Sequence, residues 1–174
     1  MSEEEFKHIV IKYQDRVYNT CLGFFHNEED AEDLAQEVFI EVHKSYDTFL
    51  AKAQLGTWVY KIAVNKCLEE IRKRKSEKRG GSETQVELSE QRSGVSDYHP
   101  GISLENKERA TVLMRAIDLL PESQRAAFTL SKIEGLSYEE IGKVMDKSIS
   151  SIESLLHRAK SGLQKLLKSY YEEN

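Results

Sequence analysis

Small polar side chains recur along one face of the segment 148–161, where they could contact DNA. At about 100° per residue of helix, this face consists of Ser150, Ser154, His157 and Ser161. Hydroxyl and imidazole groups donate and accept hydrogen bonds, and a helix in the major groove needs such groups to contact base edges. The segment therefore has the polar face of a recognition helix.

Two charged residues flank this face. Glu153 could accept a hydrogen bond from cytosine N4, or it could be a solvated glutamate near the positive end of the helix dipole. Both interpretations stay open. Phosphate-binding cations follow at Arg158, Lys160, Lys165 and Lys168.

A helix-turn-helix pattern positions the polar face. Ser137 and Glu140 have the spacing of a capping box, the turn falls at residues 146–147, and Ser148 can cap the second helix. The expected apolar stripe of that helix is Ile149, Ile152, Leu156, Ala159 and Leu163. The pattern alone is moderately specific, because two capped amphipathic helices also occur in ordinary bundles.

The rest of the chain also has helical periodicity. Ser2 and Glu5 form a second capping-box spacing, and Asn27 and Thr57 can cap two further helices. Gly135 is expected to end the helix that precedes the helix-turn-helix. Nothing alternates with a period of two, so strands are not expected and the predicted fold class is all-α.

The periodic pattern stops between residues 76 and 104. This stretch is rich in Ser, Gly, Glu and Gln, a composition that buries too little apolar surface to order itself. We therefore expect two small helical domains, residues 1–76 and about 105–174, joined by a flexible linker at 77–104.

The charge is distributed in blocks. Residues 1–47 carry 12 acidic and 4 basic side chains, whereas residues 48–79 carry 3 acidic and 9 basic ones, although the whole chain has a net charge of only −5. An acidic block followed by a basic one suggests two different partners, one basic and one anionic.

The two cysteines, Cys21 and Cys67, lie singly within amphipathic patterns. No CxxC or ligand-spaced His accompanies them, so we expect small core residues in a reducing compartment rather than a disulfide or a metal site. The start of the chain has no signal-peptide pattern and no apolar run has membrane-spanning length. The sequence favours a cytoplasmic protein without membrane insertion.

Four motifs in order carry a resemblance to a known family. They are DAEDLAQEVFIEVHKSYDTF, LGTWVYKIAVNKCLEEIRKRK, LPESQRAAFTLSKIEGLSYEEIGKVM and ESLLHRAK. Together they resemble a bacterial RNA polymerase sigma factor of the extracytoplasmic-function type. The resemblance implies a promoter-specificity subunit without catalytic activity or cofactor, with a −10-binding domain at 1–76 and a −35-binding domain at 105–174.

The resemblance also implies where core polymerase binds. In the family, the helix that begins at Asn27 docks on basic clamp helices of the polymerase largest subunit. The implied contact residues are Asp30, Asp33, Gln36, Glu37 and Glu41. The plainer interpretation is a solvated acidic face, and a metal site is a poor third because no Glu-x-x-His supports it.

For the −10 element, the family holds melted DNA with stacking surfaces, a base pocket and phosphate-binding cations. The matching aromatic residues are Trp58 and Tyr60, and Asn65 corresponds to a base-contacting asparagine. The matching cations are Lys61, Lys66, Arg72, Lys73 and Arg74. For Trp58, core packing is at least as good an explanation as stacking.

For the −35 element, the implied contacts are Ser148, Ser150, Ser151, Glu153, Ser154, His157 and Arg158. Many family members have basic residues where this chain has Glu153 and Leu155, so no −35 sequence is carried over. Many relatives are also held inactive by an anti-sigma factor, although no residue here identifies one.

Two other classes of protein compete with this interpretation. A self-sufficient helix-turn-helix regulator would leave the acidic stripe and the aromatic-basic helix unexplained. A helical metalloenzyme or signalling module would need a convergent polar site, which the sequence does not contain. The linker carboxylates Glu83, Glu87, Glu90 and Asp97 suit either a basic RNA path or a solvated tether.

Overall fold

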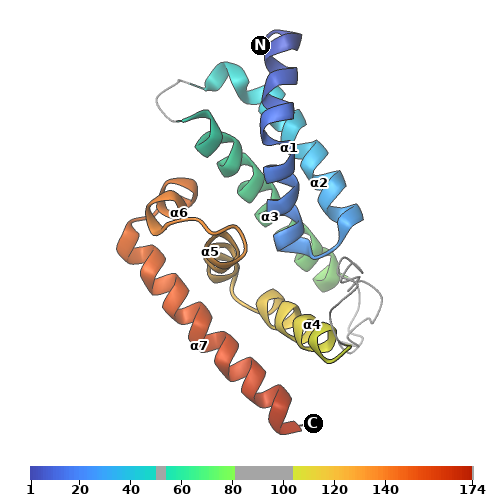
Figure 1. Ribbon diagram of the computed structural model, residues 1–174, viewed down its shortest axis with the longest axis vertical. Helices are drawn as coiled ribbons and strands as arrows, with labels where there is room; N and C mark the ends of the chain where they lie inside the picture. Colours follow the sequence, from blue (N-terminus) through green and yellow to red (C-terminus); the bar gives the residue numbers. More distant parts are fainter. Residues whose placement is uncertain (50–53, 81–103, 174) are drawn as a thin grey trace. The chain divides into compact units, whose positions relative to one another are not determined.

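The computed structural model describes residues 1–49, 54–80 and 104–173, and the regular structure within these ranges is helical. The elements (Figure 1) are α1 (Glu3–Phe25), α2 (Glu28–Ser45), the short η1 (Tyr46–Thr48), α3 (Leu55–Gly80), α4 (Leu104–Asp118), α5 (Glu122–Lys132), α6 (Tyr138–Met145) and α7 (Ile149–Glu173). The predicted all-α class is confirmed.

The chain divides into two compact units, Met1–Arg92 and Ser93–Asn174, which we call the N-terminal and C-terminal units. Most of the linker predicted at 77–104 lies outside the described residues, as do residues 50–53. Within the described ranges, no helix combines the length and the apolar character needed to cross a membrane.

In the N-terminal unit, α1, α2 and α3 each pack against the other two. Local capping sets where the first two helices begin. The Ser2 hydroxyl accepts from the Glu5 N–H at 3.2 Å while the Glu5 carboxylate accepts from the Ser2 N–H at 2.7 Å. Asn27 accepts from the Asp30 N–H at 2.8 Å. These predicted caps are confirmed.

The core of this unit lies between the apolar sides of α1, α2 and α3. Its buried residues include Ile9, Tyr13, Val17, Ala31, Leu34, Val38, Val42, Val59, Ala63 and Ile71. Cys21 and Cys67 are fully buried free thiols whose sulfur atoms lie 4.0 Å apart between α1 and α3. Both cysteines are therefore core residues, as predicted.

The prediction for the start of α3 was wrong. Thr57 lies inside the first turn rather than at the cap, because α3 begins at Leu55 and the Trp58 N–H donates to the Gln54 carbonyl at 3.1 Å. The helix also continues past residue 76 to Gly80. Adding one residue to an existing helix costs little, since each added residue gains a backbone hydrogen bond.

In the C-terminal unit, α7 packs against α4, α5 and α6. One hydrophobic cluster joins the end of α4 to α7. Its buried residues are Ala116, Ile117, Leu120, Ala159 and Leu163. Arg125 on α5 forms an ion pair with Asp118 at the end of α4, with 2.8 Å between Nη2 and Oδ1. This pair ties the end of α4 to α5.

The helix-turn-helix has the predicted local signals. Ser137 and Glu140 form the capping box of α6, and the N–H of Ser151 donates to the Ser148 hydroxyl at 3.2 Å. Asp146 has a φ of +52° and ends α6, whereas Gly135 has a φ of +69° and ends the turn after α5. The turn between α6 and α7 is thus determined by hydrogen bonds and backbone angles of residues close together in the sequence.

Candidate nucleic-acid interface

A hollow of about 450 Å³ lies on the N-terminal unit, with its lining on α2 and α3. Four of the residues predicted to contact the −10 element line it: Trp58, Lys61, Asn65 and Lys66. The hollow therefore brings together an aromatic ring, an amide and two cations. A nucleobase with its phosphates requires groups of these kinds.

Three further lining residues, Ser45, Ile62 and Glu69, were not predicted, and Glu41, predicted only as a polymerase contact, lines the hollow as well. Lys66 forms ion pairs with Glu69 at 3.5 Å and with Glu41 at 3.9 Å. Carboxylates beside Asn65 could accept hydrogen bonds from the amino group of a base. Helical spacing could have found Glu69, which lies four residues after Asn65.

Trp58 fits both interpretations that the sequence left open. Its ring is half-buried and packs against Phe49 at 5.0 Å and Tyr46 at 6.4 Å between centroids, while its remaining surface lines the hollow. Aromatic packing fixes the orientation of the indole, and that orientation leaves one side of the hollow apolar.

Tyr60 is not part of the hollow. Its side chain is 5% exposed, and the Arg16 guanidinium lies over its ring at 4.7 Å from the centroid. The buried ring offers no face on which a base could stack. In this conformation it packs against Arg16 of α1 and does not reach the protein surface.

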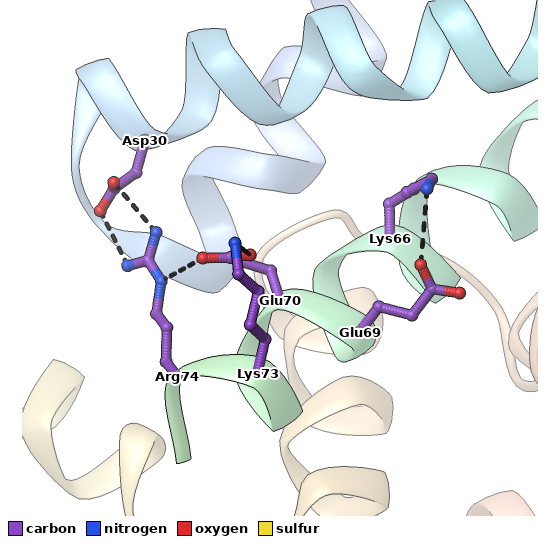
Figure 2. A network of polar contacts seen from close by, with 6 residues as sticks. All are labelled: Asp30, Lys66, Glu69, Glu70, Lys73 and Arg74. Carbon is purple, nitrogen blue, oxygen red and sulfur yellow. Dashed lines mark hydrogen bonds and ion pairs between the residues drawn. The ribbon is translucent and has the colours of Figure 1, made fainter. Parts of the chain in front are cut away.

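Arg74 lies between carboxylates (Figure 2). Its two terminal nitrogens donate to both oxygens of Asp30 at 3.0 Å, and its Nε donates to Glu70 at 2.7 Å. The hydrogen bonds to Asp30 raise the pKa of the Arg74 guanidinium, against the opposing effect of burial. The structure thus joins one predicted DNA contact to one predicted polymerase contact.

Arg72 and Lys73 are exposed on the same helix. Lys73 forms a 3.6 Å ion pair with Glu70, and its side chain is 66% exposed. Ion pairs of an exposed lysine contribute little to stability, so losing the contact with Glu70 would cost Lys73 little.

The acidic face of α2, defined as Asp33, Gln36, Glu37 and Ile40, is exposed. Ile40 was not predicted, and it leaves 51% of its surface exposed among polar neighbours. Its position outside the buried stripe of α2 could have revealed it from helical spacing. Ile40 adds apolar area beside Glu37 on this face, and single exposed apolar side chains of this kind are common on protein surfaces.

A second hollow, of about 360 Å³, lies on the C-terminal unit. Its lining includes four predicted −35 contacts, Ser150, Ser151, Ser154 and Arg158. Ser123 on α5 and Lys147 in the turn complete it, with Leu155 at its edge. No local signal could have found Ser123, because it meets α7 only through the tertiary fold.

The remaining predicted −35 residues lie on the same exposed surface of α7. Glu153 and His157 are exposed, whereas Ile152 and Leu156 are buried. Ile149 was wrongly expected in the buried stripe, since it is 45% exposed. It is the first residue of α7 and lines a shallow hollow with Gly142 and Lys143 of α6.

The serines at the start of α7 bond to one another. The Ser148 hydroxyl lies 3.1 Å from that of Ser150 and 2.8 Å from that of Ser151. The Ser154 hydroxyl donates to the Ser150 carbonyl at 3.0 Å. These bonds orient the hydroxyls while leaving their lone pairs able to accept from a base or a bridging water.

Comparison with known proteins identifies both units. Residues 9–77 match the family Sigma-70 region 2, and residues 110–163 match Sigma-70, region 4. The chain belongs to the sigma factors of the extracytoplasmic-function type. It is a promoter-recognition subunit of RNA polymerase. The region 2 match runs from within α1 through α2 and most of α3, whereas the region 4 match runs from α4 into α7.

Individual relatives are similar to this chain over nearly its whole length. RNA polymerase sigma-H factor of Pseudomonas aeruginosa is 30% identical over 95% of this chain and 87% of its own length. ECF RNA polymerase sigma factor SigW of Bacillus subtilis is also 30% identical, over 95% of this chain and 90% of its own. Sigma factor RpoE of Bartonella quintana has a similar fold, with a TM-score of 0.70, 24% identity and coverage of 95% and 98%.

Proposed function

We propose that this sigma factor binds core RNA polymerase through the acidic face of α2 and contacts the −10 element through the hollow beside Asn65. The −35 element would lie against the N-terminal half of α7. The observation that carries the proposal is the convergence of Trp58, Lys61, Asn65 and Lys66 on one hollow in the unit that matches region 2.

The acidic face suits a basic protein partner. Asp33 and Glu37 are exposed carboxylates one turn apart, and Ile40 adds apolar area one turn further on. Basic clamp helices of the largest subunit would complement this charge, which steers association and sets the register more than it adds affinity. Ile40 would supply the desolvated contact that carries affinity.

The DNA contacts divide into base-reading and phosphate-holding groups. Asn65 and the serines of α7 can donate and accept hydrogen bonds, so they suit base edges. Lys61, Lys73 and Arg158 carry charge and suit phosphates, which position the protein without reading sequence. The protein would have no catalytic activity of its own and would act in the cytoplasm with core polymerase.

Regulation by an anti-sigma factor is a second part of the proposal. RpoE of Bartonella quintana was solved in complex with the anti-sigma factor NepR, and CnrH, at a TM-score of 0.65 and 20% identity over 97% of this chain and 90% of its own, with the cytosolic domain of CnrY. An anti-sigma factor for this chain would compete with core polymerase, so adding it should release bound sigma factor from core.

Co-purification with core polymerase tests the main proposal. The full chain should bind purified core and direct it to promoters that core alone does not use. A self-sufficient helix-turn-helix regulator would instead bind duplex DNA without core and would not associate with core. That outcome would overturn the proposed function.

A further inference from the structure

Arg74 contacts all three helices of the N-terminal unit. Its guanidinium carbon lies 4.8 Å from the ring centroid of Phe25 at the end of α1. Its two terminal nitrogens donate to Asp30 in the first turn of α2, and its Nε donates to Glu70 one turn earlier on α3 (Figure 2). We call these four residues the Arg74 cluster.

The geometry of the cluster differs from that of a phosphate contact. Parallel N–H bonds between a guanidinium and a carboxylate are the strongest form of side-chain ion pair. A phosphate would have to displace Asp30 and then lie beside Glu70, so two carboxylates would oppose it. The neighbouring Lys73 has an ion pair with Glu70 at 3.6 Å and twice the exposed side-chain fraction of Arg74, 66% against 33%.

The cluster joins the two helices that carry the proposed binding surfaces. Asp30 lies in the first turn of α2, whose acidic face carries Asp33 and Glu37, and Arg74 follows Asn65 on α3. An ion pair between Glu41 on α2 and Lys66 on α3 is longer, at 3.9 Å. A bidentate fork fixes direction as well as distance, so the Arg74 cluster can help the apolar core to hold α2 and α3 in one register.

We propose that Arg74 is a positioning residue with Asp30 as its partner, and that the pair aligns the polymerase-binding face of α2 with the DNA-binding face of α3. Neither side chain then contacts polymerase or DNA directly. The inference rests on the proposed function and gives these two residues a joint role within it.

The test compares Arg74→Gln, Asp30→Asn and the double variant as full chains in holoenzyme. Promoter binding and the rate of promoter opening are measured at several salt concentrations, below the melting temperature of every variant. Each single substitution should slow opening about tenfold, and the double should be no slower than either single, which is a coupling of about tenfold. The dependence of log affinity on log salt should keep its slope.

A phosphate contact would give a different pattern. Arg74→Gln would then lower the salt slope by roughly 0.7–0.9, Asp30→Asn would leave promoter opening unchanged, and the two effects would add. That pattern overturns the inference. So does a lowered melting temperature with normal opening by the folded variants, because the pair would then only stabilise the unit.

Two further variants keep the test decisive. Arg74→Lys retains the charge but loses the fork, so it should slow opening as Arg74→Gln does; normal opening would contradict the inference even if Arg74→Gln failed to fold. Lys75→Gln removes an exposed neighbouring cation outside the cluster and should leave the opening rate unchanged. If the wild-type protein fails to bind core, the proposed function itself is wrong. If the wild type is active but the effects of Arg74→Gln and Asp30→Asn add in the double variant, only the positioning role is wrong.

Discussion

Gly142 on α6 and Lys147 in the following turn approach each other so closely that a Cβ on Gly142 would lie 2.8 Å from the Lys147 carbonyl oxygen. The Lys147 N–H also donates to the Gly142 carbonyl at 2.9 Å. The contact is backbone against backbone, so no side chain can move to relieve it. The turn that sets the angle between α6 and α7 therefore requires glycine at this position.

Gly142→Ala should destabilise the C-terminal unit by about 1–3 kcal/mol, because the added methyl group forces the turn apart. It should also weaken −35 recognition, since the start of α7 would shift. Thermal unfolding and binding of holoenzyme to promoters with and without a −35 element check this. Lys143→Ala, at the exposed neighbouring position, is the control and should retain both properties.

Reversing two charges on the acidic face should weaken core binding. Asp33→Lys with Glu37→Lys replaces attraction to a basic partner by repulsion, while both positions are exposed and the helix should stay folded. Affinity for core and circular dichroism measure the two effects. Glu4→Lys with Asp15→Lys on α1 makes the same change in net charge and should have a much smaller effect; equal losses would mean that only net charge matters.

Asn65→Ala should relax base preference in the −10 element and slow opening, while binding through the −35 element persists. The amide lines the hollow and lies on the exposed side of α3, so its loss removes hydrogen bonds without disturbing the core. Selection from a library randomised at −10 measures the preference. An unaltered preference would remove Asn65 from the base-reading residues.

The two charged residues of α7 should behave differently. Arg158→Ala should weaken binding about equally across −35 sequences and lower the salt slope by roughly one. Glu153→Lys should change the preferred base at one −35 position by about 1–3 kcal/mol if Glu153 accepts from cytosine. Holoenzyme binding over a −35 library at two salt concentrations separates these effects; a uniform gain for Glu153→Lys would make Glu153 a helix-end charge only.

Features that depend on residues close together in the sequence could be predicted, whereas features that depend on distant residues could not. Caps at Ser2, Asn27 and Ser148 involve residues at most three positions away, so local chemistry determines them. The start of α3 could not be placed, because Thr57 has capping chemistry but the helix begins two residues earlier, at Leu55, with the Gln54 carbonyl accepting its first hydrogen bond.

The sequence could propose which residues contact polymerase and which contact DNA, but it could not show how these two sets of residues lie relative to each other on the N-terminal unit. Asp30 and Arg74 were assigned to different partners because each lies among residues of its own charge. Their pairing spans 44 positions in the sequence and depends on how α2 packs against α3. Tyr60 was misplaced for a similar reason, since only the packing of α1 shows that its ring is covered by Arg16.

The central claim is that this chain gives RNA polymerase its promoter specificity, and in vitro transcription with purified core tests it most directly. Start sites are read from a promoter library randomised at both elements, with and without the sigma factor. We predict that the sigma factor creates new start sites with enriched −10 and −35 sequences at a fixed spacing, and that Asn65→Ala changes only the former. Start sites identical to those of core alone, with the protein folded and present in excess, would contradict the account.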